Sequence, residues 1–218
     1  MILFMEALAW LFAPEQRVGE NGIPNRLAEH LAYTASGLLI AALIAIPTGW
    51  LVGHTGRGRQ LAIGMSGAAR ALPSLGLITI LALLMGLDFA PVLIVLVVLA
   101  IPSILAGAYA GVEAVDRSTV DAARAVGMTE WQVLRKVEIP LGLPILVGGL
   151  RNATLQVVAT ATLAAYIGLG GLGRYIFSGL STRSFEVMLG GAILVAVLAL
   201  VLEGIFALVQ RMVAVPTR

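Results

Sequence analysis

The chain has 218 residues, of which 59% are hydrophobic and only 12% are charged, against roughly 25% charged in an ordinary soluble domain. This composition excludes a water-soluble globular protein, because too few charged side chains remain to cover its surface. Cysteine is absent, which excludes disulfides and thiolate metal sites, and the net charge of +2 forms no basic patch of the kind that binds nucleic acid.

Five apolar stretches alternate with charged segments. None of the 14 basic and 12 acidic residues falls within 30–56, 71–87, 89–112, 152–173 or 187–202. A bilayer core needs about 20 apolar residues per helix, and long unbroken runs are typical of helices rather than of barrel strands. We therefore predict an all-α polytopic membrane protein with about five transmembrane helices, at 31–52, 66–87, 90–111, 143–166 and 187–210.

The residues before the first span, 1–30, are predicted to form an external N-terminal segment, and 31–218 a transmembrane domain. The opening MILFMEALAWLFA is too short to span a bilayer, contains Glu6, and lacks the basic region and cleavage site of a signal peptide. We expect it to form a helix at the membrane interface. Pro47 and Pro73 fall inside the first two predicted spans, where we expect them to kink the helices.

The distribution of Arg and Lys predicts the orientation, because cytosolic loops of membrane proteins carry an excess of both. If the N-terminus lies outside, the outer segments contain only Arg17, Arg26, Arg174 and Arg183. The inner segments then contain Arg57, Arg59, Arg117, Arg124, Arg135, Lys136, Arg211 and Arg218. We therefore predict that the N-terminus is outside and the C-terminus is cytosolic.

The longest inner loop, 112–142, begins with the pattern of a short helix. Ser118 or Thr119 can cap this helix, which is expected to run to Ala125. Gly127 suits the left-handed stop that ends many helices.

A second short helix is expected after this glycine. Thr129 begins it, Gln132 completes a capping box, and Pro140 bounds its end. The two helices would form a compact cytosolic element between two spans. A solvated hairpin that merely connects the spans is the alternative.

This loop carries a pattern found in transport proteins. The signature of permease subunits of binding-protein-dependent ABC importers, E-A-A-x3-G-x9-I-x-L-P, is matched in spacing by Asp121-Ala122-Ala123, Gly127 and Val137-Glu138-Ile139-Pro140. The residues that depart from the signature have a similar charge or shape: Asp121 replaces Glu, Val137 replaces Ile and Ile139 replaces Leu. Four segments resemble the branch that imports osmoprotectants such as glycine betaine, carnitine and choline. They are EHLAYTASGLLIAALIAIPTG, ARALPSLGLI, VEIPLGLPILVGGLRNA and ATLAAYIGLGGLGRYIFSGL.

The resemblance implies the fold of a type I ABC importer permease that translocates such a solute by alternating access. It also implies two protein partners, a cytosolic ABC ATPase that carries ATP and Mg and an external or periplasmic solute-binding protein. The location that it implies is a bacterial or archaeal inner membrane, where the chain contacts lipid. The ATPase-coupling residues that it implies are Asp121, Ala122, Ala123, Gly127, Val137, Ile139 and Pro140.

The sequence itself also indicates that ATP is bound by a separate subunit. A phosphate-binding loop requires a lysine preceded by glycines, and the only lysine, Lys136, has no such neighbours. We therefore expect a transport subunit that binds no cofactor and has no ATPase site of its own. Five spans are few for enclosing a pathway, so a second permease chain is expected. It would form a homodimer, and pairing with a different permease of similar sequence is the alternative.

Polar residues of the fourth predicted span are candidates for the translocation path. Asn152, Gln156 and Thr160 recur every four residues and so share one helix face. Thr162 and Tyr166 have the same spacing near the outer end. Hydrogen bonding between helices is the alternative reading of such residues.

A glycine-rich segment follows this span. It matches G-x-G-x-x-G, but it comes after a membrane helix, whereas a dinucleotide site requires a preceding strand. We interpret its glycines as permitting a tight bend and close helix contact, and the resemblance places them near the external gate. These candidate gate residues are Gly168, Gly170, Gly171 and Gly173.

Three other functions are kept as alternatives. The first is a permease that imports methionine or another amino acid, which differs from an osmoprotectant permease only in its solute. Quaternary ammonium solutes are usually recognised by aromatic rings, and this chain has few, so we expect a separate binding protein to select the solute. An intramembrane protease of the rhomboid kind would use Ser66, but His30 and His54 flank opposite ends of the first span. An ion-coupled secondary transporter would need acidic residues near the middle of the membrane spans.

Overall fold

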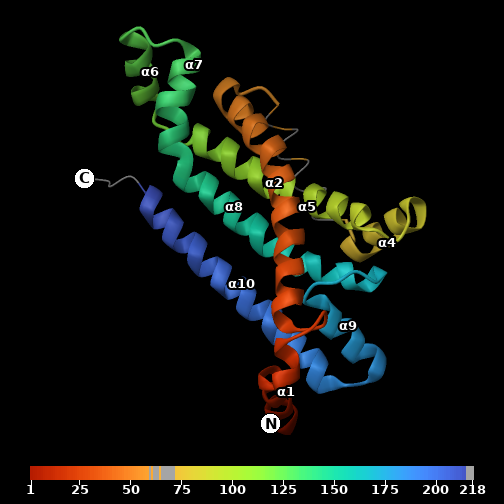
Figure 1. The fold of residues 1–218 in the computed structure, drawn as a ribbon. Coiled ribbons are helices and arrows are strands. Elements are labelled where there is room, and N and C mark those ends of the chain that lie inside the picture. The colour runs from red at the N-terminus through yellow and green to blue at the C-terminus, as the bar shows by residue number, and fades with distance from the viewer. Residues whose placement is uncertain (59, 61–63, 65–71, 215–218) are drawn as a thin grey trace. The chain divides into compact units, whose positions relative to one another are not determined.

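The structure is a computed structural model that describes residues 1–58, 60, 64 and 72–214. These residues form helices joined by turns, with no strand among them (Figure 1). The helices are α1 (Ile2–Phe12), a 3-10 turn (Pro14–Arg17), α2 (Ile23–Thr55), α4 (Ser74–Met85), α5 (Phe89–Glu113), α6 (Arg117–Ala125), α7 (Glu130–Val133), a π-helical turn (Leu134–Glu138), α8 (Ile139–Ala161), a 3-10 helix (Thr162–Ile167), α9 (Gly173–Thr182) and α10 (Phe185–Val213).

Three of the described helices are long and apolar enough to cross a membrane: α2, α5 and α10, with mean hydropathies of 2.0, 2.8 and 2.8. At 23 residues α8 is about 35 Å long, but Arg151, Asn152 and Gln156 make it more polar. Residues 66–71 of the second predicted span lie outside the described residues, and α4 has 12 residues. The all-helical membrane fold is confirmed, and the number of five spans stays a prediction.

The two prolines of the predicted spans have different positions. Pro47 lies inside α2, where the sequence places it. The prediction that Pro73 kinks a span is wrong, because Pro73 precedes α4 as its N-cap with φ −71° and ψ 102°. A proline just before a helix loses no hydrogen bond, since the first helical N–H groups have no intrahelical acceptor.

The chain folds into two compact units, which are described separately. The first unit contains residues 1–38, 73–97 and 155–202. Its buried cluster of Val158, Leu172, Tyr175 and Leu198 receives Trp10 of α1, whose ring meets that of Tyr175 edge-on at 5.0 Å. The N-terminal segment is thus helical and packed onto this unit, while its interfacial location stays a prediction.

The second unit contains the described residues of 39–72, 98–154 and 203–218. Its helices touch through glycines. A Cβ added to Gly111 of α5 would lie 2.6 Å from the carbonyl oxygen of Gly142 on α8. One added to Gly107 would lie 2.8 Å from Cα of Gly149. Small residues spaced by four permit such backbone approach between membrane helices.

Candidate functional site

The first helix of the loop, α6, begins earlier than the sequence predicts. Its N-cap is Asp116, whose carboxylate accepts the backbone N–H of Ser118 at 2.8 Å. The prediction of Ser118 or Thr119 as the cap is therefore wrong, because an ionised acceptor lies just ahead of them. Hydrogen bonds from the backbone and hydroxyl of Ser118 hold the pKa of Asp116 below its usual value. The helix ends at Ala125 as predicted, and Gly127 adopts the left-handed φ of +88°.

The second helix starts as the sequence predicts but does not stop where expected. Thr129 and Gln132 form the predicted capping box, with the Thr129 N–H donating to Gln132 Oε1 at 2.9 Å. The expectation that Pro140 ends this helix is wrong, because α7 continues through the π-helical turn into α8. Pro140 is the second residue of α8 and comes directly after the π-helical turn, so its missing N–H falls where the regular α-helical bonding is already interrupted.

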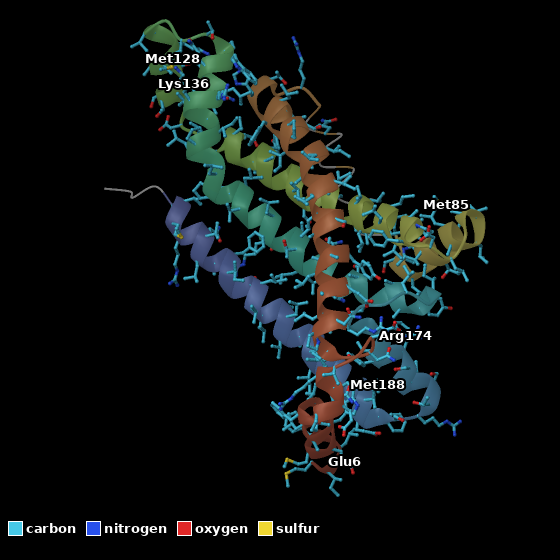
Figure 2. The ribbon with its side chains drawn as sticks, in the orientation of Figure 1. Glu6, Met85, Met128, Lys136, Arg174 and Met188 are labelled. Atoms are coloured by element: carbon cyan, nitrogen blue, oxygen red, sulfur yellow. The ribbon has the colours of Figure 1, made fainter. Side chains whose placement is uncertain are left out.

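A small apolar core holds the two loop helices together. Val120, Ala123 and Val133 are buried in it, and Met128 and Val137 pack against them. Figure 2 labels Met128 on this element. Ala123 is only 8% exposed. Two of the motif residues, Ala123 and Val137, therefore stabilise the element itself.

Other side chains of the loop have no cover from the chain. Ala122 is exposed beside the buried Ala123. Val126 is 76% exposed and Trp131 is 63% exposed. Apolar side chains left open on a short polar loop are typical of a surface that meets a partner protein.

An ion-pair network links α6 to α7. The Arg124 guanidinium donates to both carboxylate oxygens of Glu130, each at 2.9 Å, and to Oδ1 of Asp121 at 3.4 Å. The hydrogen bonds from Arg124 lower the pKa of Glu130. Because these side chains are largely exposed, the network orients the two helices more than it stabilises them.

A second, buried pair joins this element to α2. His54, near the end of α2, has Nδ1 2.5 Å from Oε2 of Glu138 in the π-helical turn and Nε2 3.3 Å from Glu130. The side chains of His54 and Glu138 are 11% and 7% exposed. The contact of Nδ1 with Glu138 is a hydrogen bond, whereas the contact of Nε2 with Glu130 is within ion-pair distance only.

Ile139, another motif residue, lines an apolar groove of about 460 Å³ in the same unit. The groove also contains Pro47, Trp50, Leu51, Trp131, Leu134 and Arg135. Pro140 itself is exposed. The motif residues thus divide between the core of the loop, this groove and the open surface.

The candidate path residues on α8 lie on a face that the chain covers only in part. Ala153 and Val157 are fully buried on the other face. Asn152 is exposed and Gln156 and Thr160 are half-buried. The Thr160 hydroxyl donates to the Gln156 carbonyl oxygen at 2.9 Å, whereas the two amide side chains have no partner within the described part of the chain.

The expected pairing of Thr162 with Tyr166 on one helical face is wrong. The α-helix ends at Ala161 and a 3-10 helix follows, in which residues four apart are about 120° apart around the axis. The Thr162 hydroxyl donates to the Ala159 carbonyl oxygen at 2.7 Å. Tyr166 is 50% exposed, and its ring lies 5.8 Å from that of Phe177 on α9.

The glycine loop, residues 168–173, makes the tight bend between the 3-10 helix and α9. Gly168 and Gly171 have φ values of +91° and +82°, which side chains rarely allow. A Cβ at Gly173 would lie 2.0 Å from the Thr162 carbonyl oxygen. A Cβ at Gly170 would meet a side chain of α2 just as closely. The glycines are therefore required by backbone geometry and packing, as the bend interpretation expects.

The structure adds little on metal binding and on the protease alternative. Among the described residues, no group of three or more His, Asp or Glu side chains could hold a metal. Ser66, the nucleophile of the protease alternative, lies outside the described residues.

Two of the ion pairs that sequence reasoning missed join distant helices. One is His54 with Glu138. The other is Arg151 of α8 with Glu203 of α10, where the arginine Nε donates to Oε2 at 2.7 Å and a second bond joins Nη2 to Oε1. The available signal was that Arg151 stands near an otherwise uncharged stretch and so needs a partner.

Comparison with known proteins identifies the family. The family model described as "Binding-protein-dependent transport system inner membrane component" matches residues 37–215. The glycine betaine/carnitine/choline transport system permease protein of Bacillus subtilis is 33% identical over 86% of this chain and 87% of its own. A carnitine transport permease protein of Listeria monocytogenes is 37% identical over 80% of each chain.

Solved structures agree on the fold. A chain of the MetNI methionine ABC transporter in an inward facing conformation superposes with a TM-score of 0.76 at 21% identity, over 88% of this chain and 96% of that one. A chain of an amino acid ABC transporter gives a TM-score of 0.72 at 20% identity, over 96% and 98%. The family match and the curated relatives confirm the resemblance to ABC importer permeases, and this protein belongs to the family of inner membrane permease components of binding-protein-dependent ABC transport systems.

Proposed function

We propose that this permease imports an osmoprotectant, a small quaternary ammonium compound such as glycine betaine, carnitine or choline, by alternating access. The observation that carries the proposal is the 33–37% identity, over most of the chain, to permeases named for these solutes. The methionine alternative has less support, because a likeness at 21% identity extends to the fold only.

In this proposal the loop helices α6 and α7 are the dock for a cytosolic ATPase, which carries ATP and Mg. The exposed Ala122, Val126 and Trp131 supply the contact, and Gly127 provides the turn between the helices. The ion pairs of Arg124 and His54 pass the motion of this dock to α2 and α8. A solute-binding protein delivers the solute at the external face.

The pathway lies, in the same proposal, between two copies of the permease. The polar face of Asn152, Gln156 and Thr160 supports this, because one chain leaves Asn152 exposed and covers Gln156 and Thr160 only in part. Thr162 and Tyr166 line its outer end, and the glycine loop forms the external gate. The homodimer brings two such faces together.

Reconstitution in liposomes tests the function. With its cognate ATPase, ATP and binding protein, the permease is expected to accumulate betaine, carnitine or choline against a gradient, and methionine not at all. Ala122→Leu is expected to reduce ATPase attachment and uptake together, because the added bulk obstructs the dock. Ala192→Leu is the matched control, since Ala192 is equally exposed but lies on α10.

Two outcomes would contradict the proposal. Uptake by the isolated permease, driven by a proton or sodium gradient and unaffected at Ala122, would make it a secondary transporter. Accumulation of methionine in preference to the quaternary ammonium compounds would support the alternative solute.

The proposed orientation, with the N-terminus outside and the C-terminus cytosolic in an inner membrane, is tested by cysteine labelling. The chain has no cysteine of its own, so single replacements report one position each. In intact cells an impermeant thiol reagent is expected to label Ser181→Cys on α9 but not Val126→Cys between α6 and α7. Both side chains are exposed in the structure, so the reverse labelling would overturn the orientation.

A further inference from the structure

Two consecutive residues of α2 bind the backbone of the glycine loop. Oε2 of Glu29 accepts the Gly171 N–H at 2.7 Å, and Nδ1 of His30 accepts the Leu172 N–H at 3.3 Å. The other ring nitrogen of His30 lies 3.0 Å from the Val158 carbonyl oxygen on α8. All five residues belong to the first unit.

The partners of His30 fix what its ring does. The Leu172 N–H can only donate and the Val158 carbonyl can only accept, so Nδ1 is the acceptor and Nε2 carries the hydrogen. The residue is 0% exposed. A neutral imidazole, shielded from solvent, therefore bridges α2, the end of α8 and the glycine loop.

Glu29 is held as firmly from its other side. Arg26 donates to the same Oε2 at 2.8 Å and to the side chain of Asn21 at 2.6 Å. A Cβ at Gly170 would lie 2.0 Å from that oxygen. The carboxylate thus sits against the loop backbone, and only glycine at position 170 leaves it room.

These contacts lie where the proposed gate begins. The loop follows the 3-10 helix that carries Tyr166, and α2 is one of the helices apolar and long enough to cross the membrane. We propose that Glu29 and His30 are positioning residues that fasten the glycine loop to the outer end of α2, so that the loop moves with α2 when access alternates. This inference rests on the proposed gate function of residues 168–173.

The first test separates acceptor loss from general damage. In the reconstituted complex, Glu29→Leu is expected to lower the solute carried per ATP hydrolysed by roughly tenfold, because the Gly171 N–H loses its acceptor. Glu29→Gln is expected to stay close to wild type, since the amide oxygen can accept both bonds. Glu15→Leu, at an exposed position of the same N-terminal segment, is the control.

The ratio of transport to hydrolysis is the deciding measurement. A merely structural role would lower the amount of active complex, and with it both activities, while the ratio stayed constant. A constant ratio in Glu29→Leu, or an equal loss in Glu29→Gln, would overturn the proposal. His30→Phe, which leaves two backbone groups unpaired, is expected to lower the ratio as Glu29→Leu does.

A disulfide tests whether the loop and α2 move together. The double variant Glu29→Cys, Gly170→Cys is expected to transport poorly when reduced and to recover when oxidised, because the new bond replaces the lost contact. Failure to recover, or a further loss that reductant reverses, would mean that the loop must leave α2 during the cycle. If the wild-type complex carried none of the osmoprotectants, the proposed function would fall instead, and disulfide yield in membranes would still report this contact.

Discussion

Replacing His54 with alanine is expected to lower the free energy of unfolding by about 3 kcal/mol, because it leaves the buried carboxylate of Glu138 without a partner. For a chain of this size the thermal midpoint should then fall by roughly 6–12 °C. Glu138→Ala is expected to act similarly, since it removes the hydrogen-bond partner of His54 Nδ1. Thermal unfolding in one detergent, followed by helix content, measures both.

A double-mutant cycle isolates the pair. The variant carrying both His54→Ala and Glu138→Ala is expected to be about as stable as either single variant, because each change removes the same interaction. Additive losses would mean that the two side chains do not interact. Arg124→Ala serves as the comparison, because it breaks an exposed ion pair of the same element and should have a much smaller effect.

The same variants should affect transport in a particular way. His54 connects α2 to the turn that follows α7, whereas the exposed Ala122 and Trp131 are untouched. ATPase attachment is therefore expected to survive His54→Ala, while the solute carried per ATP hydrolysed falls. Loss of attachment instead would place His54 in the dock rather than behind it.

The loop was the most predictable part of the molecule, because its structure is local. The capping box of Thr129 with Gln132 and the left-handed Gly127 depend on residues at most a few positions apart. The two wrong predictions in this loop also have local causes, because in each case neighbouring residues offered two possible helix ends. Asp116 is a better cap than the hydroxyls after it, and Pro140 fits the first turn of α8 as well as the end of another helix.

The contacts between distant segments could not be predicted in this way. His54 and Glu138 are 84 residues apart, and the ring of His30 meets Val158 across 128. Which charged side chains face each other depends on how each helix is rotated about its axis, and composition does not determine that rotation. The pairing of Thr162 with Tyr166 failed for a related reason, since it assumed that the α-helix continues.

The pair of Arg151 with Glu203 supplies the other large expected effect. Glu203→Leu is expected to destabilise the permease by about 2.5 kcal/mol, because an arginine on α8 would face apolar surroundings without its counter-ion. The remaining hydrogen bond from Arg151 to Gln210, at 3.3 Å, is too long to compensate. The thermal midpoint in detergent and the yield in membranes should both fall.

The double variant Arg151→Leu, Glu203→Leu shows what the pair is for. Two leucines that fill the same space leave no charge unpaired, so stability is expected to return to near the wild-type value. Full uptake in that variant would mean that the ion pair serves folding alone. We expect uptake to remain low, because the arginine also reaches Gln210, whose amide nitrogen donates to the Pro144 carbonyl oxygen at 3.2 Å and so holds α10 in register with α8. A Glu203→Leu variant as stable as the wild type would contradict the pairing itself.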